Sequence, residues 1–439
     1  YSSAASDVYK RQNKYKMKNN FFLSLMLFLF FAILANAQEA YFSDSTLRID
    51  YTFSGDIKKQ EISVSELRFS KGWYGRRLNM NCVHQKGNGQ IIMKDAASGK
   101  VIYCQSFSTL FQEWLGTEEA TRLRKSFENV YLLPMPKDSV IIDIELYNFR
   151  QDVIAKFSHV VNPHDILIRP SEYSGVPYTI LHQGKWGKNN IDIAIVAEGY
   201  TEGEMDVFYE HAKETVEAIF SHAPFDKYKE RFNIVAVGVP SKNSGVSIPG
   251  KYIWKETAVN SHFDTFYSDR YLTTLHLKQL HDILAGIPYE HIIMLANTEN
   301  YGGGGIYNSY TLTSARHSTF RPVVVHEFGH SFAGLADEYY YDDQYVEYYY
   351  PDIEPWEQNI TTLHDFSKKW KHLLRKGTEI PTQKTLKEGE VGVIEGAGYQ
   401  SKGVFRGCEN CRMKTNEARV FCPVCQDAIE RLILYYTGK

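Results

Sequence analysis

The sequence has little of several features that define particular protein classes. Its 439 residues include only 6 Cys and 14 Pro, and charged residues make up 23%. These values exclude a disulfide scaffold, a collagen-like chain and a heptad-repeat protein, while 43% apolar residues excludes a disordered chain. The formal net charge is −3, so no overall basic charge favours nucleic acid or an anionic membrane.

Only one long apolar run is present, from Phe21 to Leu34, and it lies between a short basic start at Met17 and the sequence Ala35-Asn36-Ala37. This pattern predicts a signal peptide that is cleaved after Ala37. A membrane anchor needs about 20 apolar residues, so cleavage is favoured over a span. Residues 1–16 read as an extension that is not native. We expect an exported protein, periplasmic, on the cell surface or extracellular, without a transmembrane segment in the mature chain.

After the predicted signal peptide, the chain divides into two regions with different residue patterns. Apolar and polar residues alternate over 47–53 and 142–146, and a turn at 95–99 separates two short apolar runs. Such short strands predict an N-terminal antiparallel β-sandwich over residues 38–163. Residues 162–190 are punctuated by Pro and Gly and read as a linker and the entry to a second domain.

The second domain, 164–439, has the alternation of an α/β fold. Apolar runs at 191–197, 232–239 and 291–296 predict buried strands, with a helical stretch near 275–284 before the last of them. Thr201 and Glu204 have capping-box spacing and precede apolar residues at helical intervals. The whole chain is therefore predicted to be an α+β protein of two domains.

The strongest chemical signal is His326-Glu327-Phe328-Gly329-His330. Histidines four apart on a helix project from one face and can hold one Zn²⁺, while Glu327 can take a proton from a water molecule that the metal acidifies. We expect His326 and His330 to be metal ligands and Glu327 to be the catalytic general base.

The third metal ligand is expected shortly after the helix. Gly334 can end the helix in a conformation that other residues avoid, which would bring a carboxylate back to the histidines. Asp337 is the predicted ligand. Glu338 is its main rival, and Glu347 is a less favoured one.

This segment resembles the metzincin metallopeptidases, whose pattern is HExxHxxGxxH or the same with Asp last. In this chain, Gly334 and Asp337 each lie one residue later than the corresponding positions of that pattern. Metzincins also carry a methionine beneath the metal, and Met413 in Cys411-Arg412-Met413-Lys414-Thr415 is the candidate for it.

Four stretches together resemble the bacterial IgA peptidase family of zinc endopeptidases. They are HEFGHSFAGLADEY, AEGYT at 197–201, CRMKTNEA and FCPVC. The resemblance covers the chain from about Ile191 to the C-terminus and implies a metzincin-like zinc-peptidase domain that cleaves a protein. Cleavage of immunoglobulin A belongs to the name-giving member and is not carried over to this chain.

The cysteines allow two interpretations. Cys408, Cys411, Cys422 and Cys425 form two C-x-x-C pairs with ten residues between them, a spacing typical of structural zinc in a cytosolic protein. Because export is predicted, one or two disulfides beside Met413 are favoured over a second zinc site. Cys82 and Cys104 are candidates for a further pair, or for free thiols.

Two other patterns lie near the predicted centre. The glycines at 302–305 suit either an edge strand that pairs with extended substrate or a flexible loop. Seven tyrosines fall between Tyr339 and Tyr350 and are expected beside the cleft. Tyr399 is expected to be an ordinary residue, although a hydroxyl there could stabilise an oxyanion.

The predicted function is that of a secreted zinc-dependent endopeptidase acting on a protein substrate. One alternative is an exported adhesion protein that binds glycan or protein and has a non-catalytic zinc site. The other is a zinc hydrolase of amide bonds outside proteins. An intact Glu327 speaks against the first alternative, because a structural zinc ion needs no base.

Overall fold

The computed structural model describes residues 41–341, 348–383 and 385–438, so the predicted signal peptide and Glu347 lie outside the described residues. The strands are β1 (Phe42–Gly55), β2 (Gln60–Lys71), β3 (Gly89–Asp95), β4 (Val101–Phe107), β5 (Lys125–Pro136), β6 (Val140–Tyr147), β7 (Val153–Val161), β8 (Arg169–Pro170), β9 (Tyr178–His182), β10 (Ile191–Glu198), β11 (Phe232–Val237), β12 (His291–Ala296), β13 (Gly303–Ile306), β14 (Tyr310–Ser314), β15 (Tyr340–Tyr341), β16 (Ile360–Thr361), β17 (Ile394–Ala397) and β18 (Tyr399–Arg406). The α-helices are α2 (Leu110–Leu115), α3 (Met205–Phe220), α4 (Phe225–Tyr228), α5 (Leu277–Ile283), α6 (Phe320–Ala333) and α7 (Pro423–Thr437).

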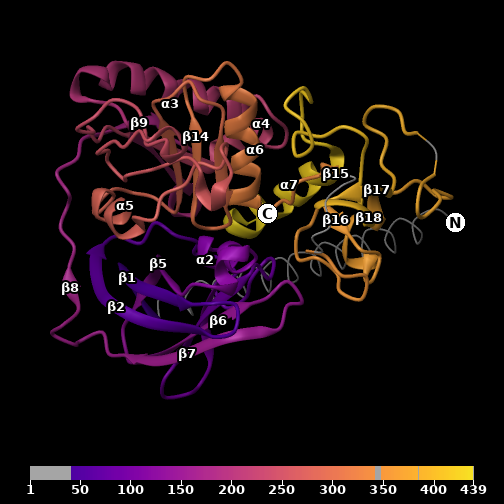
Figure 1. Ribbon diagram of the computed structural model, residues 1–439. Coiled ribbons are helices and arrows are strands. Elements are labelled where there is room, and N and C mark those ends of the chain that lie inside the picture. The colour runs from indigo at the N-terminus through magenta and orange to yellow at the C-terminus, as the bar shows by residue number, and fades with distance from the viewer. Residues whose placement is uncertain (1–40, 342–347, 384, 439) are drawn as a thin grey trace, which may run out of the picture.

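The N-terminal part contains two four-stranded sheets, with strand orders β5-β1-β2-β8 and β4-β3-β6-β7 (Figure 1). All neighbouring strands are antiparallel except β2 and β8. Aromatic rings pack between the two sheets. The ring centroids of Phe53 in β1 and Phe107 in β4 are 6.4 Å apart, and those of Tyr51 in β1 and His159 in β7 are 5.8 Å apart. The alternating segments at 47–53 and 142–146 are strands, as predicted.

The second part is built on a six-stranded sheet of order β13-β14-β12-β10-β11-β9. The four central strands are parallel, and β13 and β9 run antiparallel at the two edges. The predicted apolar runs are β10, β11 and β12, and the capping box of Thr201 and Glu204 forms before α3. Helices α3 and α6 contact each other and the sheet.

The stretch at 162–190, predicted as a linker and the entry to a second domain, includes β9, an edge strand of the second sheet. Its residues Tyr178, Thr179 and Ile180 are exposed. An edge strand with little burial has no need of a regular apolar pattern, so the flanking Pro and Gly dominated the sequence signal.

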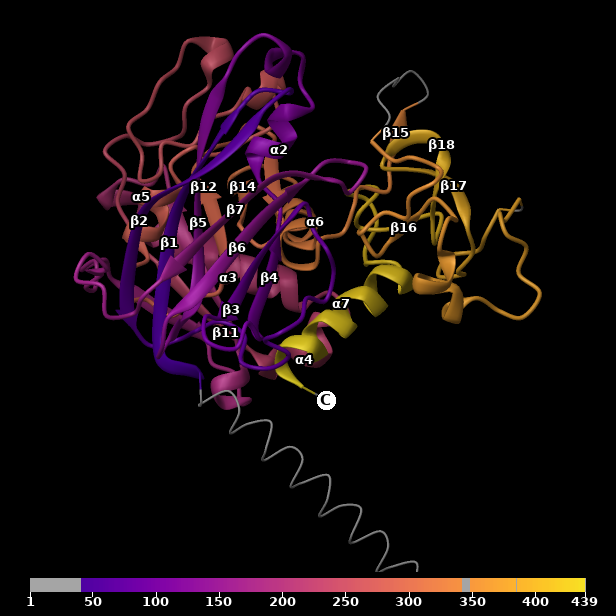
Figure 2. The same ribbon diagram turned by 90° about the horizontal axis from the view of Figure 1, so that it is seen from below.

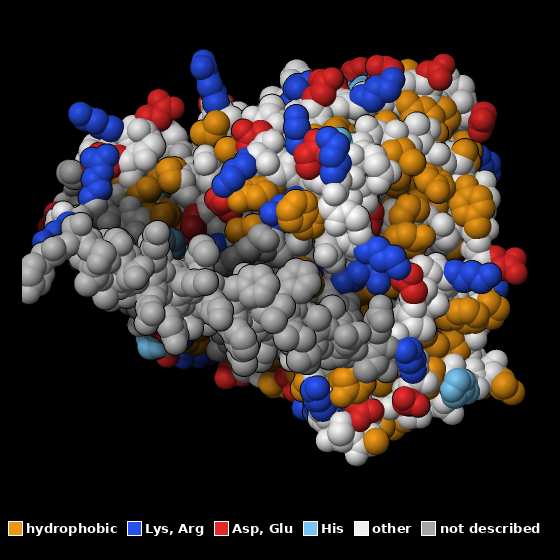
Figure 3. All heavy atoms as spheres, turned by 180° about the vertical axis from the view of Figure 1, so that it is seen from behind, with side chains coloured by type: hydrophobic (Ala, Val, Ile, Leu, Met, Phe, Trp, Pro, Cys, Tyr) orange, Lys and Arg blue, Asp and Glu red, His pale blue; other side chains and the backbone are white. Residues whose placement is uncertain are grey.

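Strands β15 to β18 form a small lobe beside α7, apart from the other three sheets (Figures 1 and 2). On the face opposite Figure 1, positive and negative side chains are interspersed, as the small net charge suggests (Figure 3). In the described part of the chain, no helix has the length and apolar character needed to cross a membrane.

The two main parts meet close to α6. Gln85 donates a hydrogen bond of 3.0 Å from Nε2 to the carbonyl of Ala333, the last residue of α6. Asn308 donates one of 2.8 Å from Nδ2 to the carbonyl of Ser106 in β4. The N-terminal part therefore supplies polar contacts to the helix that carries the histidines.

A buried carboxylate anchors the loop beside this sheet. Glu198, at the carboxyl end of β10, is 0% exposed. It accepts hydrogen bonds from the backbone N–H groups of Val259 (3.0 Å) and Ser261 (2.9 Å) and from the hydroxyls of Thr257 and Ser261. The loop leads to residues 270–272, which pair with β13.

We expect Glu198→Ala to lower the free energy of unfolding by about 2–4 kcal/mol, because it leaves buried donors without an acceptor. Denaturant unfolding measures this change. The matched control, Glu202→Ala at an exposed position four residues away, should change the free energy by less than about 0.5 kcal/mol. Equal effects of the two variants would contradict the anchoring role.

Candidate functional site

Helix α6 places the two predicted histidines on one face. His326 Nε2 and His330 Nε2 lie 3.0 Å apart, and their side chains are 15% and 16% exposed. His326 Nδ1 lies 3.0 Å from the carbonyl of Arg412, and His330 Nδ1 lies 2.6 Å from that of Leu335. A carbonyl only accepts, so each Nδ1 carries the proton and each Nε2 presents a lone pair to the same point.

The chain turns at Gly334, as the sequence predicts. Gly334 has φ +57° and donates its N–H to the carbonyl of His330 at 2.9 Å, which ends α6. A β-carbon at this position would clash with Gln85 Nε2 and lie 2.7 Å from Trp356 Cζ3. Glycine is required both by the left-handed conformation and by this close contact.

After the turn, Asp337 faces the histidines. Its Oδ1 lies 3.1 Å from His326 Nε2 and 3.2 Å from His330 Nε2. Its Oδ2 accepts a hydrogen bond from the hydroxyl of Tyr399. Tyr399, expected to be an ordinary residue, therefore orients the carboxylate, and no feature of its sequence context indicated that contact.

The next residue, Glu338, points away from the histidines. It is 0% exposed, and its Oε1 lies 3.0 Å from Cys425 Sγ and accepts from Asn359 Nδ2 at 3.0 Å. Its N–H donates to the carbonyl of Met413 at 2.8 Å. Of the two adjacent carboxylates, only Asp337 lies with the histidines.

Glu327 lies against two glycines of β13. A β-carbon on Gly303 would be 2.9 Å from Glu327 Oε1, and one on Gly305 would clash with the Glu327 carbonyl and lie 2.9 Å from His330 Cβ. The glycine run is thus an ordered strand that lets α6 approach the sheet closely. The outer side of Gly303 pairs with Arg270 and Leu272, so this stretch of edge is covered.

The carboxylates of the group favour a positive charge in the pocket. Burial acts to raise the pKa of Asp337, but the charges of His330 and His326 hold it well below its usual range. Burial acts to lower the pKa of His330, yet Asp337 and Glu327 raise it to about 9. Burial raises the pKa of Glu327, although the charges of His326 and His330 act to lower it. The pocket therefore stabilises a cation.

Met413 lies beneath α6. It is 0% exposed, and its Sδ would be 2.7 Å from a β-carbon on Gly329. The preceding residue, Arg412, supplies the carbonyl that contacts His326. Met413 therefore packs under the helix at the turn between the two histidines.

A cleft of about 950 Å³ opens above these residues. Four tyrosines of the 339–350 tract line it, as expected, namely Tyr339, Tyr341, Tyr348 and Tyr349; Tyr345 lies outside the described residues. Glu113 of α2 also lines the cleft and accepts from the Tyr271 hydroxyl. Burial raises the pKa of Glu113 to about 7, although the hydrogen bond from Tyr271 acts to lower it. The sequence offered no signal for Glu113, because it belongs to the N-terminal part.

The expected disulfides are absent from the described residues, where all six cysteines are free thiols. Cys411 Sγ and Cys425 Sγ lie 3.6 Å apart, whereas a disulfide needs about 2.05 Å. Cys82 is exposed and Cys104 is buried. The preference for disulfides, drawn from predicted export, is therefore wrong for this structure.

The residues around His326 fit a divalent metal ion. Two lone pairs and a carboxylate oxygen face one point, and Asp337 Oδ1 is buried without a hydrogen-bond donor among the described residues. Tetrahedral ligands about 2.0 Å from one ion lie about 3.3 Å apart. The three separations of 3.0, 3.1 and 3.2 Å are close to that value.

Two protein-family models match the chain. Residues 181–390 and 383–433 match the family model described as IgA Peptidase M64, and residues 38–158 match the model described as Peptidase M64 N-terminus. No curated protein matches the chain.

Two glycine variants separate conformational cost from packing cost at the turn. Gly99 also has positive φ, +69°, but no atom would contact a β-carbon there. We expect Gly334→Ala to lower the free energy of unfolding by about 3 kcal/mol and Gly99→Ala by about 1 kcal/mol. Chemical denaturation of both variants checks this, and equal losses would show that contact with Gln85 and Trp356 does not matter.

Proposed function

This chain belongs to the IgA peptidase M64 family of metallopeptidases, and on that premise we propose that it is a secreted zinc-dependent endopeptidase of protein substrates. The observation that carries the proposal is the convergence of His326, His330 and Asp337 beside Glu327 in a cleft of about 950 Å³. The family implies a peptidase, and the cleft has room for an extended chain.

We assign the metal to His326 Nε2, His330 Nε2 and Asp337. When bound, zinc supplies a Lewis acid that polarises the scissile carbonyl and lowers the pKa of water. The hydrogen bonds from His326 to the Arg412 carbonyl and from His330 to the Leu335 carbonyl fix both rings in the tautomer that a metal needs. Tyr399 holds Asp337 through its other oxygen.

Glu327 is the general base in this proposal. Its carboxylate takes a proton from the attacking water and delivers it to the leaving amine nitrogen. Gly303 has no side chain, so the carboxylate lies directly against this strand, and it lines the cleft that would hold a peptide chain.

The proposal extends to the domains and the compartment. We propose an N-terminal β-sandwich over 38–163 and a metzincin-like catalytic domain over 164–439. The two facing four-stranded sheets support the first description, and the turn at Gly334 that returns Asp337 to the histidines supports the second. Export follows from the signal-peptide pattern that ends at Ala37.

The general base is tested by Glu327→Gln, which keeps the side-chain shape against Gly303. We expect the variant to retain its metal and to lose about 10²- to 10⁴-fold in cleavage of an unfolded protein mixture. Glu417→Gln, at an exposed position on the rim of the cleft, is the control and should cleave normally.

Unchanged cleavage by Glu327→Gln would overturn the assigned base. A wild-type chain that binds zinc but cleaves no protein would contradict the endopeptidase and favour an exported binding protein or a hydrolase of other amides.

The third ligand is tested by Asp337→Ala. We expect this variant to lose the zinc held by the histidines, because two imidazoles alone bind weakly, and to lose cleavage with it. Elemental analysis after dialysis against a weak chelator measures the metal, with Glu417→Ala as the control. Full zinc content in Asp337→Ala would show that another group completes the site.

A further inference from the structure

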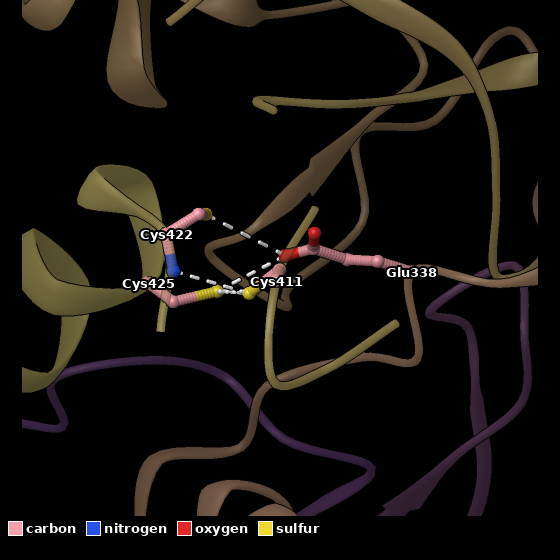
Figure 4. Close-up of side chains that lie close together, drawn as sticks. All are labelled: Glu338, Cys411, Cys422 and Cys425. Atoms are coloured by element: carbon pink, nitrogen blue, oxygen red, sulfur yellow. Dashed lines mark hydrogen bonds between the residues drawn. The ribbon is translucent and has the colours of Figure 1, made fainter. Parts of the chain in front are cut away.

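A second cluster of metal-ligating side chains lies below the first. Cys411, Cys422, Cys425 and Glu338 point toward one another (Figure 4), and each is at most 2% exposed. Cys425 Sγ lies 3.6 Å from Cys411 Sγ and 3.0 Å from Glu338 Oε1, which is 4.0 Å from Cys422 Sγ. We propose that these four residues hold a structural zinc ion, distinct from the metal beside Glu327.

The spacing fits an ion better than a covalent bond. Sulfur ligands about 2.3 Å from a tetrahedral zinc ion lie about 3.8 Å apart, close to the 3.6 Å between Cys411 and Cys425. Three cysteines and one further ligand match the closed donor sets of structural zinc sites. Cys411 comes from the first C-x-x-C pair, and Cys422 and Cys425 form the second.

Glu338 provides an independent reason for a cation. Its Oε2 is buried and has no hydrogen-bond partner among the described residues. An ionised carboxylate in such a position is costly unless a positive charge compensates it. The neighbouring sulfurs cannot do so, since thiolates are also anionic. A divalent ion between them would satisfy all four ligands.

Backbone groups already support a thiolate at Cys411. The N–H groups of Met413 and Cys422 donate to Cys411 Sγ at 3.5 and 3.2 Å. Cys422 is the N-cap of α7 and Cys425 lies in its first turn, where the free N–H groups favour negative charge. Such outer contacts are typical of metal-bound cysteine.

The fourth cysteine, Cys408, is buried beside the cluster, next to the side chain of Cys422. We assign the fourth position to Glu338, since its oxygen lies within the group of ligand atoms and the sulfur of Cys408 lies outside it.

This site would fix the floor of the catalytic centre. Between Cys411 and Met413 lies Arg412, whose carbonyl accepts from His326, and Met413 packs under Gly329. The Met413 carbonyl also accepts from the N–H of Glu338. An ion at the cysteines thus holds the segment that orients His326, and Asp337 and Glu338 face two different metals.

Cobalt replacement tests the proposal, because a sulfur-to-cobalt charge-transfer band requires thiolate ligands and cannot arise from His326, His330 and Asp337. We expect two equivalents of zinc per wild-type chain and, after replacement with Co²⁺, the charge-transfer band. The double variant His326→Ala/His330→Ala should keep one equivalent and the band. Cys411→Ser/Cys425→Ser should lose the band, and the exposed-thiol control Cys82→Ser should keep it.

The wild-type chain and the histidine variant decide the matter even where the cysteine variant does not fold. No charge-transfer band in either, or a disulfide that includes Cys411, Cys422 or Cys425 after denaturation without reductant, would overturn the site. If the chain does not cleave protein, this test still applies, because it measures the sulfur-to-cobalt band and not cleavage. Weaker cobalt binding in Glu338→Gln, with Cys408→Ser unchanged, is the expected result for the fourth ligand; the reverse would overturn the assignment of Glu338.

Discussion

The left-handed turn at Gly334 is the constraint on which the candidate site depends. Two histidines one turn apart provide only two ligands, and a continuing helix would carry the next carboxylates away from them. The turn ends α6 with the Gly334 N–H on the His330 carbonyl and places the Leu335 carbonyl on His330 Nδ1. The same few residues thus stop the helix, orient one ring and return Asp337 to both rings.

Close packing on both sides of α6 keeps this geometry in place. Gly303 and Gly305 bring β13 against Glu327 on one side, and Gly329 admits Met413 on the other. Each of these glycines lacks the β-carbon that would hold the elements apart. The helix therefore lies nearer to its neighbours than ordinary side chains permit, and this close packing sets the position of His326 and Glu327.

Local spacing predicted the part of the site that a single helix determines. The histidines share a face because the helical period is 3.6 residues, and the apolar runs gave the strands β10, β11 and β12. The sequence left Asp337 and Glu338 as rivals because adjacent carboxylates look alike locally. Their directions depend on Tyr399, Asn359 and Met413, which lie far along the chain.

Other differences have the same origin in distant contacts. The edge strand β9 follows from pairing with β11, and its own exposed residues carry no period. The disulfide prediction followed from the expected compartment, whereas the buried sulfurs lie around a carboxylate. Glu113 reaches the cleft from α2, in a part of the chain that shares no motif with the peptidase region.

The hydrogen bond from Gln85 to the end of α6 limits how this protein can be divided. The side chain that donates to the Ala333 carbonyl belongs to the N-terminal part. Glu113, which lines the cleft, belongs to the same part. A second part cut free after β7 would expose the end of α6 and leave the cleft incomplete. The second part is therefore not a module that can be moved into another protein without the first.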